Sequence, residues 1–142
     1  MEEAVFSASS FFMMKKILAI LVLLSFVFIS CHQEQKNIEQ VAYAYLDALA
    51  NYKVEEAKPY ATSETCKTTL AISEQLLAMV DTAYIISDTP AIIDIQEIIV
   101  ENDTMAVVKY VKNTPLKHDM KGELRLVKRE RQWWAHDLLS KS

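Results

Sequence analysis

The chain has 142 residues, 51% of them hydrophobic and 24% charged, and its 15 Lys and Arg against 19 Asp and Glu give a net charge of −4. Charges of both signs are interspersed without a basic stripe, which argues against a nucleic-acid partner. The single glycine excludes the glycine-rich loops that hold nucleotide phosphates. The length suits one domain rather than two.

An apolar segment near the N-terminus has the order of a secretory leader. Lys15 and Lys16 precede the apolar run 17–29, and Ser30 then stands before Cys31. A helix of this length rises only about 20 Å, whereas a hydrocarbon core of about 30 Å needs roughly 20 residues. The run is therefore typical of a signal peptide. The alternatives to a lipoprotein signal peptide are an ordinary secretory leader and a short membrane anchor.

The small residue followed by Cys31 resembles the lipobox of bacterial lipoproteins. In that class the cysteine is lipidated and becomes the mature N-terminus, so the resemblance implies a cell-envelope protein held in the membrane by lipid on Cys31. His32 is not the aspartate that retains some lipoproteins in the inner membrane, which favours the outer membrane of a Gram-negative bacterium. Cys66 would then lack a partner within the chain, and its helical context predicts a buried small hydrophobe rather than a reactive thiol.

Residues 1–13 fit a leader poorly because Glu2 and Glu3 place negative charge where positive charge is expected. We predict that translation begins at Met14 or Met13 and that residues 1–13 are a start-site artefact. The predicted organisation is then a lipoprotein signal peptide over 14–30, a lipidated cysteine with a polar tether over 31–36, and one domain over 37–142.

Helical periodicity follows the tether. Apolar residues spaced three and four apart from Ile38 to Leu49 predict a helix, with Asn37 as its N-cap and an end near Asn51. Residues 54–60 predict a short second helix that Pro59 ends or kinks. A third helix is expected from Thr62 or Ser63 to about residue 81.

The C-terminal half predicts strands. β-Branched residues are frequent in 91–101, and further strands are expected over 104–112, 123–128 and 132–138. Asn102-Asp103, the loop 113–119 and the charged turn 129–131 separate them. Helices followed by antiparallel strands predict an α+β fold, with three N-terminal helices on one face of a curved antiparallel sheet of about four strands.

Three segments carry a resemblance to a known superfamily: A-Y-L-D-A-L-A-N-Y-K-V-E-E-A-K-P-Y, N-D-T-M-A-V-V-K-Y and L-R-L-V-K-R-E-R-Q-W-W. Together they resemble the nuclear transport factor 2-like, or cystatin-like, cone fold and its small lipoproteins, over residues 38–138. The glycine usual in the last turn is missing, since Glu130 or Arg131 stands there, and a longer or type I turn could replace it. The resemblance implies the fold and says little about function.

A two-residue turn at Asn102-Asp103 would place Glu97 opposite Val108 on the inner face of the sheet, with Ile99 opposite Ala106. By resemblance this face lines the cone, which predicts a pocket formed by Tyr45, Ile95, Glu97, Val108 and Tyr110. As an acid among apolar side chains, Glu97 is the candidate catalytic residue. A β-bulge that turns Glu97 to solvent is the alternative that we favour.

The two tryptophans must face opposite ways. Trp133 is expected in the core with Ala135, Leu124 and Leu126. Trp134 would lie on the convex face, where the neighbours expected are Met105, Val107, Ile98 and Val100. An apolar convex face suggests a homodimer or an envelope protein partner, with Trp134, Met105 and Val107 at the interface.

No histidine spacing, including that of His118 and His136, indicates a metal site, and no cofactor motif is found. The mostly aliphatic predicted lining favours a non-enzymatic, lipid-anchored envelope domain that binds a small apolar ligand or a protein partner. One alternative is a cone-fold enzyme of isomerase or dehydratase type that uses Glu97, with Tyr45 and Asp47 as further candidates. Another is an envelope immunity or inhibitor protein.

Overall fold

The computed structural model describes residues 2–139, with side chains for 12–24 and 31–139. It divides into two compact units, Met1–Gln35 and Lys36–Ser142, which are described separately. A single long helix, α1 (Glu2–Ala50), begins in the first unit and ends in the second.

The first unit is helical throughout its described residues. The segment 31–36, predicted as a polar tether, lies within α1, and so does Asn37. The prediction that a helix begins after Asn37 is therefore wrong for this chain. Within the described residues, no helix has an apolar stretch long enough to cross a membrane.

Short helices follow α1 in the second unit. Their bounds are α2 (Val54–Ala57), a 3-10 turn (Lys58–Tyr60), α3 (Ser63–Thr65), a π-helical turn (Cys66–Leu70), α4 (Ala71–Leu77) and α5 (Thr82–Ser87). The second predicted helix is confirmed, and the third is the run from α3 to α4. The described chain has five α-helices rather than the three expected, partly because α5 is separate: Asp81 caps it, accepting a hydrogen bond from the Ala83 amide at 3.0 Å.

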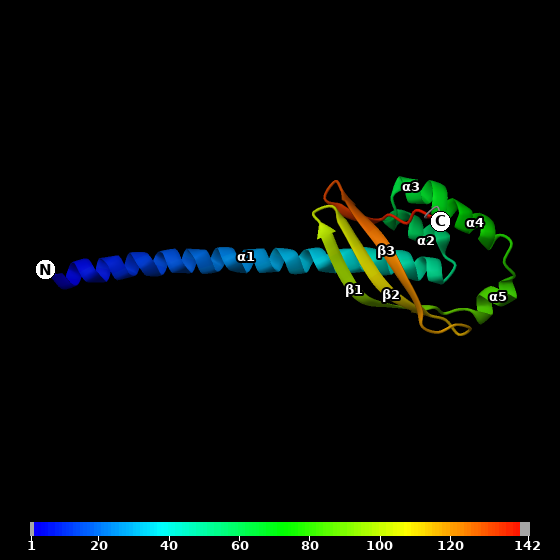
Figure 1. Cartoon of the computed structure of the whole chain (residues 1–142), viewed down its shortest axis with the longest axis horizontal. Coiled ribbons are helices and arrows are strands. Elements are labelled where there is room, and N and C mark those ends of the chain that lie inside the picture. Colours follow the sequence, from blue (N-terminus) through cyan, green and yellow to red (C-terminus); the bar gives the residue numbers. More distant parts are fainter. Residues whose placement is uncertain (1, 140–142) are drawn as a thin grey trace. The chain divides into compact units, whose positions relative to one another are not determined.

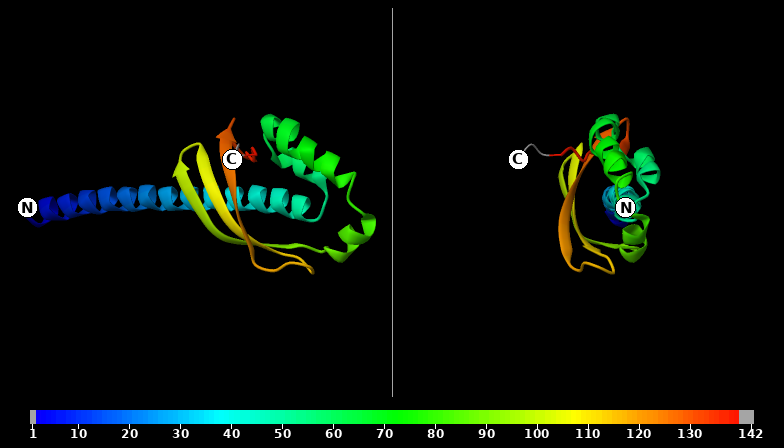
Figure 2. Two further views of the ribbon diagram at one scale, coloured as in Figure 1. Left: turned by 45° about the vertical axis from the view of Figure 1, so that its right-hand side comes forward. Right: turned by 90° about the vertical axis from the view of Figure 1, so that its right-hand side faces the viewer.

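Four antiparallel strands form one sheet, in agreement with the predicted number. They are β1 (Ile92–Asn102), β2 (Met105–Asn113), β3 (Met120–Arg129) and β4 (Gln132–Ala135), in the spatial order β1-β2-β3-β4. Each strand therefore pairs with the next along the chain, as in a meander (Figure 1). In the second unit the helices lie on one side of the curved sheet (Figure 2), which is the α+β arrangement expected.

A β-bulge at Gln96 changes the predicted register. Ile95 pairs with Tyr110 as expected, but Glu97 pairs with Lys109 instead of Val108. From Glu97 to Val100 each β1 side chain therefore lies on the face opposite to the one predicted. A second irregularity follows between Val100 and Asn102, and Asn102 pairs with Met105, so the two-residue turn is Asp103-Thr104 and the predicted turn at Asn102-Asp103 is wrong. Ile98, opposite Val108, turns inward, and Val100 likewise faces in opposite Ala106, whereas Ile99 faces out opposite Val107.

The turn between β3 and β4 is a two-residue hairpin formed by Glu130 and Arg131. Their φ angles are 53° and 65°, both in the left-handed region. Two such residues match a type I′ turn, whose twist suits a hairpin. The prediction of a longer or type I turn is therefore wrong. Glu130 and Arg131, although neither is glycine, adopt a backbone conformation that glycine favours.

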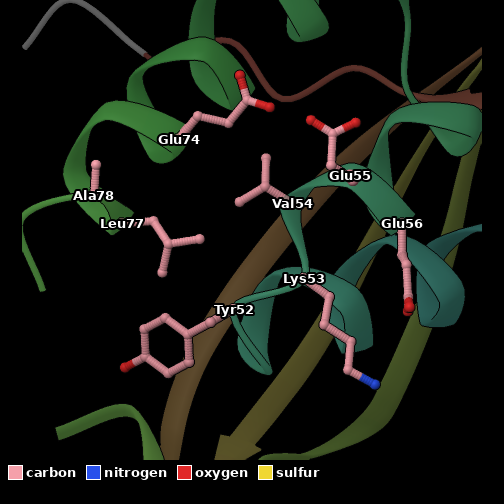
Figure 3. A pocket seen from close by; sticks show the side chains of 8 residues that line it. All are labelled: Tyr52, Lys53, Val54, Glu55, Glu56, Glu74, Leu77 and Ala78. Atoms are coloured by element: carbon pink, nitrogen blue, oxygen red, sulfur yellow. The ribbon is translucent and has the colours of Figure 1, made fainter. Parts of the chain in front are cut away.

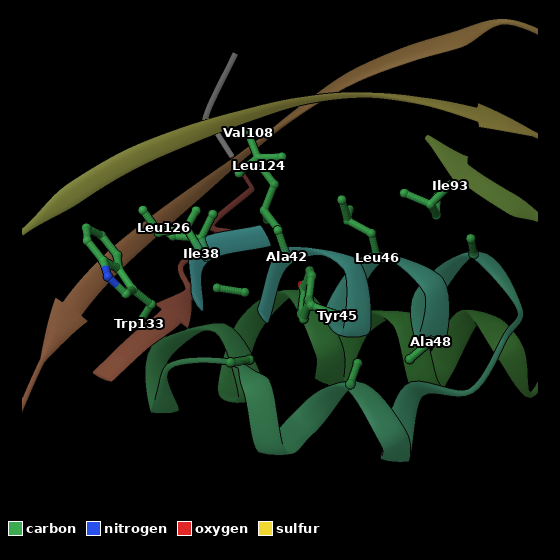
Figure 4. Close-up of a cluster of buried hydrophobic side chains, with 14 of the residues drawn as sticks. Ile38, Ala42, Tyr45, Leu46, Ala48, Ile93, Val108, Leu124, Leu126 and Trp133 are labelled. Atoms are coloured by element: carbon green, nitrogen blue, oxygen red, sulfur yellow. The ribbon is translucent and has the colours of Figure 1, made fainter. Parts of the chain in front are cut away.

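The core of the second unit lies between α1 and the inner face of the sheet (Figure 4). Ile38 and Ala42 of α1 are completely buried, as are Val108 and Leu126 of the sheet. Trp133 is 5% exposed and joins them, as predicted. The helix thus occupies the concave side of the sheet.

Candidate functional site

The predicted pocket residues are brought together, with one exception, but they belong to the packed core. Tyr45 and Val108 have no exposed surface, and Ile95 and Tyr110 are partly buried against the same cluster. Tyr110 also covers Gly122, where a Cβ atom would lie 2.5 Å from the tyrosine ring. The cone interior at these residues is thus filled by side chains of α1 and the sheet.

Glu97 is the exception, because the bulge at Gln96 places it on the outer face. Its carboxylate is exposed and lies 3.8 Å from the Nζ of Lys109 on the neighbouring strand. A carboxylate so placed lacks the apolar enclosure that the acid–base interpretation requires. The register that placed Glu97 in the pocket is therefore wrong. The structure contains a β-bulge that turns Glu97 to solvent, which is the alternative that we favoured from the sequence.

Tyr45 contacts a carboxylate that sequence reasoning did not single out. Its hydroxyl donates to Oδ2 of Asp137 at 2.9 Å. Burial, followed by the charge of Asp137, raises the pKa of Tyr45 well above its ordinary value. The sequence predicted a last strand over 132–138, but β4 ends at Ala135, so Asp137 lies in the segment beyond the sheet and its contact with Tyr45 was not predicted. Asp47, the third enzymatic candidate, instead accepts hydrogen bonds from the side chain of Asn51.

A row of threonines holds the segment that follows β4. The Oγ1 of Thr62 lies 3.0 Å from Nδ1 of His136, and the Oγ1 of Thr65 accepts from the Asp137 amide at 3.0 Å. The hydroxyl of Thr69 donates to the Asp137 carbonyl. The spacing T-x-x-T-x-x-x-T, with all three on one helical face, is the signal that could have revealed this row. Each hydroxyl is already paired, so the row serves to attach the C-terminal segment.

Both cysteines are free thiols, Cys31 exposed and Cys66 partly buried. The Cys66 thiol donates to the carbonyl of Lys58 at 3.7 Å. Within the described residues, no three His, Cys, Asp or Glu side chains gather to hold a metal ion.

The outer face of the sheet carries an apolar patch, which we call the outer-face patch. Its five residues are Ile99, Met105, Val107, Val127 and Trp134, which the strand pairing places on one face. Each is only partly buried. The indole N–H of Trp134 donates to the carbonyl of Arg129 at 3.3 Å, which fixes the ring at the end of the patch. The structure thus brings together the three predicted interface residues, with Ile99 in place of Ile98 and Val100.

A groove of about 360 Å³ adjoins the patch at the β3–β4 turn. Trp134 lines it together with Tyr60 and Arg131. The aromatic surface therefore continues from the sheet around the hairpin, where Tyr60 is 40% exposed.

Comparison with protein-family models finds no match, and neither does comparison with curated protein sequences. The fold is similar to the crystal structure of a "putative NTF2-like transpeptidase" from Campylobacter jejuni. The TM-score is 0.55 at 17% sequence identity, and the match covers 73% of this chain and 99% of the other. At this identity the likeness establishes the nuclear transport factor 2-like fold alone.

Proposed function

We propose that the protein is a lipid-anchored, non-enzymatic binding domain of the bacterial cell envelope, attached through Cys31 and located in the outer membrane of a Gram-negative organism. Its partner, a second copy or another envelope protein, would bind the outer-face patch. The observation that carries this proposal is the contrast between a filled inner face and an apolar patch on the outer face, where it is bordered by charged residues such as Arg125, the partner of Val107.

A free face of an antiparallel sheet normally presents polar residues at alternate positions. Here Met105 and Val107 alternate outward with Ala106 and Val108 inward, so this part of β2 is apolar on both faces. Contiguous exposed apolar surface is typical of interaction sites. Trp134 would anchor the interface, because large aromatic residues often dominate binding energy.

The enzymatic alternatives receive less support. An isomerase or dehydratase of the expected type would need Glu97 in the cone, and Glu97 lies outside it. The name of the Campylobacter jejuni protein suggests acyl transfer, which commonly uses a hydroxyl or thiol nucleophile activated by a base. In this chain the Thr62 hydroxyl is buried and caps a helix, and the Cys66 thiol donates to a carbonyl. An immunity or inhibitor protein would use the same outer surface and is a variant of our proposal.

The lipid anchor is tested by intact-mass analysis of the protein extracted from host membranes. We expect a mature chain that begins at Cys31 and carries acyl chains, because two or more chains are needed for firm attachment. Cys31→Ala should abolish the added mass, whereas the matched variant Cys66→Ala should retain it. A wild-type protein that is unacylated and found in the soluble fraction would contradict the proposal.

A further inference from the structure

A groove between α2 and α4, on helices rather than on the sheet, has features of a ligand site. Its volume is about 580 Å³, within the range of about 300–1,000 Å³ typical of small-molecule sites. All of its lining residues belong to the second unit. None of them belongs to the outer-face patch.

One side of the groove is apolar. Val54, Leu77 and Ala78 line it with the ring of Tyr52 (Figure 3). Tyr52 has a φ of 62°, and its hydroxyl donates to Oδ2 of Asp88 at 2.7 Å. The ring is therefore held in place before any ligand arrives, which limits the entropy lost on binding.

The other side is acidic, and its charges are incompletely neutralised. Glu55 of α2 and Glu74 of α4 both contact the Nζ of Lys58, at 2.7 and 2.6 Å. These carboxylates raise the pKa of Lys58, Glu55 before Glu74. Lys53 and Glu56 also line the groove, so two ammonium groups stand against three carboxylates and one net negative charge is left. Figure 3 shows both carboxylate groups above Val54; the Nζ of Lys58, which the figure does not draw, contacts both of them.

We propose that this groove binds a small organic cation with an apolar body, such as a quaternary ammonium compound. The apolar body would rest against Tyr52, Val54 and Leu77, and the positive charge would lie beside Glu55 and Glu74. A cation completes the charge balance of the site, whereas an anion of the same size adds to its net negative charge. The inference goes beyond the proposed function and depends neither on lipidation nor on the outer-face patch.

The test uses the full chain in a nonionic detergent, titrated calorimetrically with benzyltrimethylammonium, with empty micelles as the blank. Benzenesulfonate is the matched anion. We expect saturable binding of the cation at one site per chain and none of the anion. Glu74→Gln leaves two carboxylates, Glu55 and Glu56, against Lys53 and Lys58, and should weaken cation binding about fivefold, the upper range for an exposed ion pair. Lys58→Met should strengthen it by a similar factor.

Two further variants locate the binding. Ala78→Trp fills the groove from an exposed position and should abolish binding while the thermal unfolding transition persists. Glu123→Gln removes an exposed carboxylate from the sheet, outside the groove, and should leave the affinity unchanged. The inference is overturned by absence of cation binding, by equal affinity for both ions, or by unchanged binding in Ala78→Trp or Glu74→Gln.

Discussion

Tyr45 combines complete burial with a hydrogen bond to a carboxylate, so its hydroxyl ties the first core helix to the C-terminal segment. Tyr45→Phe keeps the ring and removes that bond, leaving the Asp137 oxygen without its donor. We expect a loss of about 1–2 kcal/mol in the free energy of unfolding, measured by urea denaturation with an unchanged slope. Tyr43→Phe, at a residue 47% exposed, is the control and should cost almost nothing.

The raised pKa of Tyr45 also predicts how stability depends on pH. An unfolded tyrosine titrates near pH 10, and the folded protein holds the Tyr45 proton more tightly. This contribution is fully present below about pH 10 and is lost as the pH rises further. Wild-type stability should therefore fall above about pH 10 more steeply than that of Tyr45→Phe. Equal slopes for the two proteins would contradict the assignment.

At the residue scale, the sequence predicted that strand side chains alternate between the two faces of the sheet. It did not predict the position at which a β-bulge interrupts this alternation. Ile95 opposite Tyr110 and Trp133 in the core follow from the two-residue period of a strand. Gln96 carries no local signal for a bulge, because the bulge depends on how two strands fit a curved sheet. A single extra residue was enough to move Glu97 out of the predicted site.

At the element scale, the backbone of the β3–β4 turn is strained, and two substitutions should relieve that strain. A non-glycine residue in the left-handed region costs about 1–2 kcal/mol, and Glu130 and Arg131 both lie there. Glu130→Asn with Arg131→Gly supplies the residue pair that type I′ turns favour. We expect a gain of about 1 kcal/mol or more in the free energy of unfolding. Asp103→Gly is the control, since Asp103 has no positive φ and glycine there should give no gain.

The elements themselves were largely predictable. Four strands, the second helix and the end of the first follow from periodicity and from turn residues. The turn between the first two strands is displaced by one residue, because Asn102 pairs with Met105 and the turn is Asp103-Thr104. The start of α1 and the separate α5 were not predicted. The sequence predicted that the third helix ends near Asp81. An aspartate is equally typical of an N-cap, and Asp81 caps the start of α5.

At the scale of the whole molecule, the fold follows from the order of helices and strands. The proposed binding surface is inferred from outward residues of β2 that are apolar where polar residues are expected. The nuclear transport factor 2-like fold was expected from the sequence and is supported by the structural comparison. The function is not contained in the fold, because proteins of one fold carry unrelated sites. The filled inner face and the outer-face patch therefore carry the functional proposal.

The most direct test of that proposal is photo-crosslinking in host membranes. A benzophenone amino acid replaces Val107, within the outer-face patch, in the full chain. We predict one defined adduct, either a dimer of this chain or a complex with a single envelope protein. The same probe at Lys121, on the same face but outside the patch, should give none, and Trp134→Lys should abolish the Val107 adduct. Absence of an adduct at Val107, or equal adducts at both positions, would contradict a binding role for this face.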